Sequence, residues 1–323
     1  MKELEYTISI RTVGKGGEKY QKLLDSIKKS SIQPKEVQII LPEGYRPPKE
    51  RLGYEQFLYS PKGMVSQRVF GGKAANTDYI LFLDDDVEFA EDFVEKMARP
   101  ILDGICECTI PPQLSMLPPE HGVRKIIPML CLNMVPAMFN KSTMYTKVMK
   151  SGGSIYNRID KDKVEEYLTA ETAAGPFFFI KRDVFNDMRF EEELWLEDCD
   201  YAYPDDLVMF YKLVTLGYRI KCVAKAEVLH LDAGSGSDNG KRGCDVSYAW
   251  GRNWMIFWKK FIYNRQTNLY NKLISLGMYK YNEYMNTIIL WVETIYCRSK
   301  KQEFKERMKG LKDGKEYIKK NNL

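Results

Sequence analysis

Short apolar runs alternate with helical segments through the first hundred residues, and this alternation constrains the fold more than any other feature. The apolar runs predict buried strands: TISIR at 7–11, VQIIL at 37–41, QFLY at 56–59 and YILFL at 79–83, with PFFFI at 176–180 and YRIKCVA at 218–224 later in the chain. Apolar residues recur at helical spacing between and after them: 20–27, 64–75 and 90–102. Strands that alternate with helices in this way form a mostly parallel sheet flanked by helices. We therefore predict an α/β fold.

The C-terminal part of the chain differs from the rest in charge. The 323 residues carry a formal net charge of +5, from 49 Lys and Arg and 44 Asp and Glu. From Arg252 onward there are 16 Lys and Arg and 6 Asp and Glu, a net charge of +10. The preceding part has 33 Lys and Arg and 38 Asp and Glu, a net charge of −5. Phe304, Met308 and Leu311 recur there at helical spacing. We predict a main domain over 1–231 and a basic helical extension over 232–323. Its charge suits phosphates or an anionic membrane, or belongs to a solvated tail.

Three adjacent aspartates, Asp84, Asp85 and Asp86, follow the predicted strand YILFL. Ligands of open α/β sheets bind beyond the carboxyl ends of the strands. Because strand side chains alternate, Asp84 and Asp86 should face one side and Asp85 the other. Hard divalent cations prefer carboxylate oxygens and commonly share their shell with a substrate phosphate. The triplet therefore predicts a metal–phosphate site, and the alternative is a helix cap with exposed acids.

A second acidic pair, Asp205 and Asp206, precedes apolar residues at helical spacing. One of the two is either the N-cap of this helix or a general base that takes a proton from an attacking hydroxyl. A nearby cluster competes for the role of base: Glu197, Asp198 and Asp200. His230 ends the apolar run AEVLH, so it is either a structural histidine or a metal ligand at a strand end.

The sequence also argues against several classes of protein. It contains neither the G-x-x-x-x-G-K-[ST] phosphate loop nor the G-x-G-x-x-G fingerprint. The seven cysteines are scattered without C-x-x-C spacing, and we expect them to be reduced. The start of the chain shows no secretory signal, and the most apolar windows are too short to span a bilayer. We expect a cytoplasmic protein with at most peripheral contact at the inner face of the cell membrane. Nucleic-acid binding is not expected, because the basic charge is confined to the tail.

Six segments in order resemble the glycosyltransferase family 2 enzymes. They are TISIR, GMVSQRVFGGKAANTDYILFLDDD, PFFFIKRDVF, YPDDLVMFYKLVTLGYRI, the histidine of EVLH, and GRNWMIFWKK. The resemblance covers roughly Thr7 to Lys260 and implies the GT-A fold. It implies an inverting transfer of a sugar from a nucleotide-diphosphate sugar, with Mn²⁺ or Mg²⁺ as cofactor. The acceptor would be a saccharide or a lipid-linked saccharide, as in bacterial surface polysaccharide synthesis.

The resemblance also implies roles for individual residues. Asp206 matches the general base, and Asp205 stands where the family has a glutamate. The metal positions are Asp86, Asp84 and His230. The positions for the nucleotide sugar are Thr12, Glu43, Arg68, Asp78, Asp84 and Asp85. The positions for the acceptor are Trp195 and Gly175, although Trp195 is equally suited to the core.

Other interpretations remain open at this point. A nucleotidyltransferase of sugar metabolism also uses acids and a divalent ion on an α/β sheet, and a catalytically dead carbohydrate-binding relative would keep the same motifs. The apolar window 126–139 and four aromatic residues suggest docking on a membrane, or else core packing and a homodimer. These aromatic residues are Trp254, Phe257, Trp258 and Tyr263.

Overall fold

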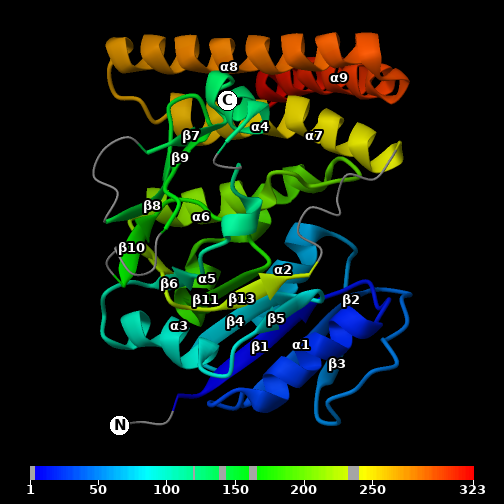
Figure 1. Cartoon of the computed structure of the whole chain (residues 1–323), viewed down its shortest axis with the longest axis vertical. Helices are drawn as coiled ribbons and strands as arrows, with labels where there is room; N and C mark the ends of the chain where they lie inside the picture. The colour runs from blue at the N-terminus through cyan, green and yellow to red at the C-terminus, as the bar shows by residue number, and fades with distance from the viewer. Residues whose placement is uncertain (1–3, 119–120, 138–142, 160–165, 232–239) are drawn as a thin grey trace.

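The computed structural model describes residues 4–118, 121–137, 143–159, 166–231 and 240–323. A large sheet flanked by helices forms one end of the molecule, and the C-terminal helices stack across the other end (Figure 1). This arrangement confirms the predicted α/β class and the helical C-terminal region. The predicted boundary after residue 231 falls at 232–239, outside the described residues, and stays a prediction.

Four parallel strands form the first block of the sheet, in the order β3-β2-β1-β4. Their bounds are β1 Tyr6–Arg11, β2 Glu36–Pro42, β3 Gln56–Ser60 and β4 Tyr79–Asp84. Helices follow at the predicted places: α1 Glu18–Lys29, α2 Met64–Ala74 and α3 Phe93–Leu102. Side chains of β4 alternate between two cores: Ile80 and Phe82 pack with α2, and Leu81 and Leu83 with α1 and α3. Both faces of this block are therefore covered, as its continuous apolar runs predict.

Beyond β4 the sheet is mixed, because β11 (Phe177–Lys181) runs antiparallel to both of its neighbours. The order continues β11-β6-β12-β10-β8-β9-β7. The further strands are β6 Cys108–Ile110, β7 Met134–Pro136, β8 Met144–Val148, β9 Ser154–Tyr156, β10 Tyr167–Ala170 and β12 Ile220–Val223. The sequence predicted β11 and β12. It did not predict the short strands, which offer too few residues for an apolar pattern.

A separate two-stranded sheet pairs β5 (Val87–Phe89) with β13 (Val228–His230) in antiparallel fashion. Its register sets His230 opposite Val87, the residue after the aspartate triplet. The backbone N–H of Leu231 donates to the carbonyl of Asp86 at 2.8 Å. This pairing brings His230 close to Asp86, 144 positions earlier in the chain.

Six further helices occur in the described residues. They are α4 Val123–Leu130, α5 Arg182–Asp187, α6 Asp205–Thr215, α7 Lys241–Phe257, α8 Leu269–Tyr296 and α9 Arg298–Lys320, with shorter turns at Leu114–Met116, Phe190–Glu197 and Trp258–Tyr263. Three of the aromatic residues predicted for membrane docking, Trp254, Phe257 and Trp258, are buried in the core. The core alternative is therefore correct for them. No helix in the described ranges is long and apolar enough to cross a bilayer.

Candidate active site

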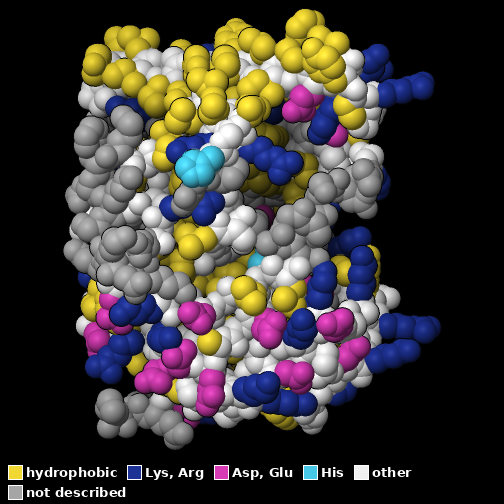
Figure 2. Space-filling view, in the orientation of Figure 1, with side chains coloured by type: hydrophobic (Ala, Val, Ile, Leu, Met, Phe, Trp, Pro, Cys, Tyr) yellow, Lys and Arg dark blue, Asp and Glu magenta, His cyan; other side chains and the backbone are white. Residues whose placement is uncertain are grey.

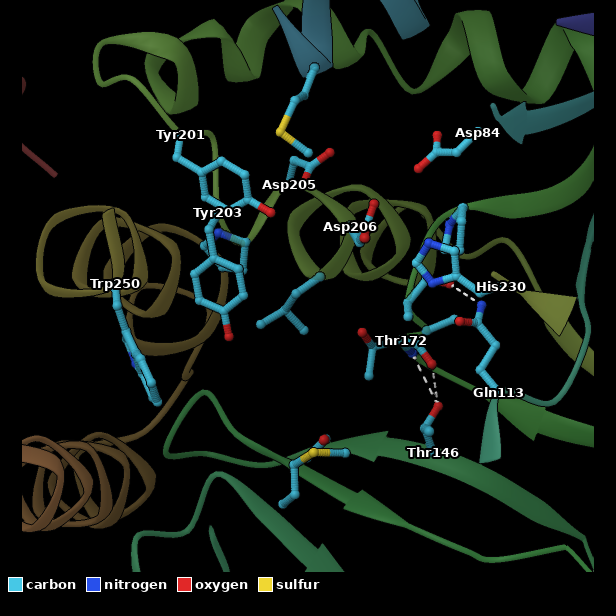
Figure 3. Close-up of a pocket in the computed structure, with 18 of the residues that line it drawn as sticks. Asp84, Gln113, Thr146, Thr172, Tyr201, Tyr203, Asp205, Asp206, His230 and Trp250 are labelled. Atoms are coloured by element: carbon cyan, nitrogen blue, oxygen red, sulfur yellow. Dashed lines mark hydrogen bonds between the residues drawn. The ribbon is translucent and has the colours of Figure 1, made fainter. Parts of the chain in front are cut away.

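A cavity of about 1110 Å³ lies beyond the carboxyl ends of β1 and β4. Seven of the predicted site residues line it: Thr12, Asp84, Asp85, Asp86, Asp205, Asp206 and His230. Figure 3 shows Asp84, Asp206 and His230 on one side of this space and Tyr201, Tyr203 and Trp250 on the other. The triplet caps no helix, since β5 intervenes and α3 begins only at Phe93.

Asp84 is held by Arg11, a residue that the sequence analysis did not single out. The guanidinium donates to both carboxylate oxygens, at 2.5 Å from Nε to Oδ1 and 2.9 Å from Nη2 to Oδ2. Burial alone would raise the pKa of Asp84, but the Arg11 guanidinium outweighs it and holds this pKa below its usual value. The register of β1 and β4 pairs these two residues directly. Asp84 thus has a fixed cation already, and the geometry does not support its predicted role as a metal ligand.

Asp86 and His230 form the pair of donors that faces the cavity. Nε2 of His230 lies 3.1 Å from Oδ2 of Asp86, and both side chains are partly exposed. A carboxylate oxygen and an imidazole nitrogen are ligands that Mn²⁺ accepts. Among the described residues, no group of three or more His, Cys, Asp or Glu side chains could hold a metal. These two donors therefore fit a divalent ion whose other ligands come from a bound diphosphate or water.

Asp85 lies in the turn after β4, lines the same cavity as its two neighbours, and accepts a hydrogen bond from the Thr12 hydroxyl. The predicted strand alternation does not extend across the triplet, because β4 ends at Asp84. Burial raises the pKa of Asp85, although the Thr12 hydroxyl opposes this effect. The glycine-rich turn after β1 offers little to a phosphate, because the amide of Gly14 donates to Thr12 and that of Gly17 to Glu50.

Asp206 sits in the first turn of α6 and faces the cavity. Its Oδ2 accepts from the Gly175 amide at 2.8 Å, and its Oδ1 accepts from Nη2 of Arg68 at 3.1 Å. A Cβ at position 175 would lie 2.1 Å from that Oδ1, so only glycine allows this approach. Burial, together with the nearby charge of Asp205, raises the pKa of Asp206 to about 6. Such a carboxylate has the pKa of a general base that works near neutral pH.

Asp205 and Arg68 support Asp206 from within the protein. Oδ2 of Asp205 accepts from Nη1 of Arg68 at 2.9 Å and lies 3.4 Å from Nη1 of Arg11. Arg68 is only 2% exposed and does not line the main cavity. The structure therefore contradicts its predicted contact with the nucleotide. Asp205 is almost fully buried between guanidinium groups, so it positions the site rather than taking a proton.

Residues 57–126, which include α2, β4 and the triplet, match the family model described as glycosyl transferase family 2. This match covers 70 of the 323 residues. The comparison with curated proteins finds no match. Among solved structures, the crystal structure of GalNAc-T7 with UDP, GalNAc and Mn²⁺ is 16% identical, with a TM-score of 0.52. The alignment covers 88% of this chain and 55% of that one. A mannosyltransferase from Pyrobaculum calidifontis in complex with GDP-Man and Mn²⁺ is 12% identical over 87% of this chain and 71% of its own, with a TM-score of 0.49.

The likeness to the GalNAc-T7 structure confirms the predicted fold, and the match over residues 57–126 confirms the resemblance to family 2 for that segment. The chain spans about half the length of the GalNAc-T7 chain, so this likeness does not transfer that protein's activity to this chain.

The rival acidic cluster has structural roles. Glu197 accepts from the backbone amides of Val65 and Ser66, at 2.6 and 2.8 Å, and so caps the start of α2. Asp198 pairs with Arg252 at 2.6 Å, and Asp200 is exposed. None of the three lines the cavity. Asp206 is therefore the acid with the geometry of a base.

Three other residues with predicted contacts lie away from the cavity. Trp195 is buried, and its Nε1 donates to Glu193 at 2.6 Å, so the core alternative is the correct one. Asp78 precedes β4 and therefore lies at the opposite end of that strand from the triplet. Glu43 follows β2 and is exposed outside the cavity lining. Of the three, only Asp78 sits in a segment that resembles the family, and the segment alone does not say which way its side chain points.

The far side of the cavity is aromatic, and the sequence analysis did not predict it. Tyr203 packs against Trp250 and Trp254 of α7, each with ring centroids 6.1 Å apart. Neither indole N–H has a hydrogen-bond partner among the described residues. The four-residue spacing of Trp250 and Trp254 was the available signal, since it sets both on one side of a helix.

Proposed function

We propose that this protein is a metal-dependent inverting glycosyltransferase that moves a sugar from a nucleotide-diphosphate donor to a saccharide hydroxyl. The observation that carries the proposal is Asp206, a cavity-facing carboxylate whose pKa is raised to about 6 and whose two oxygens are held by Arg68 and Gly175. The GT-A fold and the Asp86–His230 pair support it.

The acceptor hydroxyl attacks the anomeric carbon of the donor sugar while Asp206 accepts the hydroxyl proton. A new C–O bond forms on the face opposite the diphosphate, and the bond from that carbon to the diphosphate oxygen breaks. Asp206 must take its proton as the bond forms, because a carboxylate is too weak a base to ionise a sugar hydroxyl beforehand. Arg68 and Gly175 keep the accepting oxygen in place.

A divalent ion held by Asp86 and His230 would offset the charge that develops on the leaving diphosphate. Arg11 and Asp84 form a neutral pair beside it, so Asp84 adds little repulsion toward the diphosphate. The wall of Tyr203, Trp250 and Trp254 suits an acceptor sugar, because aromatic faces pack against C–H surfaces and the indole N–H groups can donate to hydroxyls. Bacterial polysaccharide synthesis, with a saccharide or lipid-linked acceptor, remains the process we propose.

Binding and hydrolysis of UDP-, GDP- and dTDP-sugars, with and without Mn²⁺, test the proposal. We expect at least one donor to bind in a metal-dependent manner and to be hydrolysed slowly without acceptor. Asp86→Ala should abolish the metal dependence, whereas Asp78→Ala, at the other end of the same strand, should keep it. A protein that binds no sugar nucleotide, or an Asp86→Ala variant with unchanged turnover, contradicts the proposal.

A further inference from the structure

Helix α8 turns its apolar side outward and its polar side toward the protein. Ser275 and Asn282 are buried on the inner side, where the indole N–H of Trp258 donates to the Ser275 hydroxyl at 3.0 Å. Ten large apolar side chains, which we call the outer face of α8, are exposed: Leu269, Tyr270, Leu273, Tyr281, Tyr284, Ile288, Trp291, Val292, Ile295 and Tyr296. Figure 2 shows them as a continuous apolar band along one end of the molecule. A helix that faces water has the opposite arrangement.

The outer face is too broad for a simple pair of helices. At about 100° per residue, nine of the ten side chains lie within an arc of roughly 140° from Trp291 to Tyr296 through Tyr281, and no charged residue lies within it. Leu269 lies outside this arc, beyond the exposed Lys280. A coiled-coil seam is narrower, with charged residues at its margins. The mixture of Tyr and Trp with Ile and Leu is typical of helices that lie in the interface of a bilayer.

The charge next to this face is positive. Helix α9, which packs against α8, contains 10 Lys and Arg and 4 Asp and Glu, a net charge of +6. Val123, Ile126 and Leu130 of α4 are also exposed, and Asn133, just after α4, bonds to Asn282 of α8 at 2.7 Å. An apolar surface beside a strongly basic helix is complementary to anionic phospholipids.

We propose that the outer face of α8 docks the protein on an anionic membrane surface, with the helix lying flat in the interface. The inner side of α8 touches the active-site wall, since Asn133 lines the cavity and bonds to both Asn282 and Asn286. Docking therefore sets the acceptor side of the cavity near the bilayer, where a lipid-linked acceptor is presented. This last step rests on the proposed function; the docking itself does not.

Co-sedimentation with vesicles tests the docking. The full chain should bind vesicles of phosphatidylcholine mixed with phosphatidylglycerol, bind phosphatidylcholine alone weakly, and lose affinity as salt rises. The double variant Ile288→Glu and Trp291→Glu should bind about tenfold more weakly or worse. Both residues are at least half exposed, so the variant should keep its circular dichroism.

Leu102→Glu is the matched control, because Leu102 is also 50% exposed but lies at the end of α3. It should bind vesicles like the unaltered protein. Equal binding by the double variant, or no binding by the unaltered protein, overturns the proposal. So does a dimer in sedimentation velocity that the double variant dissociates without any vesicle binding, since the occupant is then a second copy. Donor hydrolysis, measured in parallel, reports on the proposed function separately.

Discussion

Asp205 and Asp206 are neighbours in sequence but have different environments. Asp205 is nearly inaccessible, and its carboxylate is the closer partner of the Arg68 guanidinium. Asp206 is more exposed to the cavity, and its carboxylate lies slightly farther from the same guanidinium. Two adjacent carboxylates with one principal cation cannot both be ionised cheaply, so the pKa of Asp206 rises. The division of roles between the two residues follows from this arrangement.

Asp206→Asn should lower the rate of transfer by about a hundred- to ten-thousand-fold and leave donor binding intact. In the unaltered protein, the rate should fall as the pH drops through about 6, because protonated Asp206 cannot accept the proton. Single-turnover rates and donor calorimetry measure both effects. If Asp206→Asn keeps its transfer rate, another residue is the general base.

The same raised pKa predicts how stability depends on pH. The pKa of Asp206 in the folded protein lies above the ordinary aspartate value of 3.8. Asp206 therefore contributes stability that is fully present below pH 3.8 and is lost as the pH rises through about 6. Asp206→Asn removes this loss. The melting temperature of Asp206→Asn minus that of the unaltered protein should therefore be more positive at pH 8 than at pH 4.5. The reverse order would contradict the assigned shift.

Arg11→Met should leave the Asp84 carboxylate without its partner. Breaking a fully buried pair costs about 3–5 kcal/mol, because the remaining charge is uncompensated. The two side chains here are 14% and 23% exposed, so we expect a smaller loss of stability. The double variant Arg11→Met with Asp84→Asn should recover most of that loss. Urea unfolding of both variants measures the difference. If the double variant is as unstable as the single one, the pair is not what matters at this position.

At the scale of elements, Glu197 shows how a distant residue completes a helix. Helix α2 begins after Gly63 without a side-chain cap of its own, and the Glu197 carboxylate accepts from two of its first amides. A Cβ at position 63 would lie 2.2 Å from this carboxylate. Because α2 also carries Arg68, this cap helps to hold the group that orients Asp206.

Glu197→Ala should lower the free energy of unfolding by about 1–2 kcal/mol, the usual cost of losing a helix cap. It should also slow transfer, since Arg68 then has a less well-fixed helix. Asp200→Ala, three residues on and 73% exposed, is the control and should change neither quantity measurably. Equal effects of the two substitutions would mean that the cap contributes nothing.

The sequence predicted the elements whose apolar pattern is continuous, namely the parallel block, β11 and α6. The resemblance to family 2 implied that the triplet, Asp206 and His230 belong to one site, and all of them line the cavity. The rule about strand ends placed only the triplet, because Asp206 begins a helix and His230 ends a strand of the separate small sheet. The sequence could not predict Arg11 as the partner of Asp84, which depends on the register between β1 and β4. Nor could it predict that Arg68 and Trp195 point inward, since orientation is set by packing partners far away in the chain.

At the scale of the whole molecule, the C-terminal helices are part of the site rather than a loose tail. Helix α7 supplies Trp250 and Trp254 to the cavity and packs closely on α9. Gly251 and Gly310 allow this contact, because a Cβ at either position would lie within 2.5 Å of a backbone oxygen of the other helix. A shift of the basic helix α9 should therefore also move α7 and the two tryptophans that line the cavity.

Gly310→Ala tests this coupling, with Gly277→Ala on α8 as its matched control. Alanine favours a helix over glycine by about 1 kcal/mol at both positions. A Cβ at 277 meets nothing within 4 Å, so that variant should be as stable as the unaltered protein or more so. A Cβ at 310 would lie 2.2 Å from the carbonyl oxygen of Tyr248, so Gly310→Ala should cost about 1–3 kcal/mol by forcing the helices apart. Because α7 then shifts its tryptophans, the acceptor KM should rise while the donor Kd stays the same. If both variants gain stability equally, or if donor binding weakens as much as acceptor binding, α9 does not position the acceptor wall.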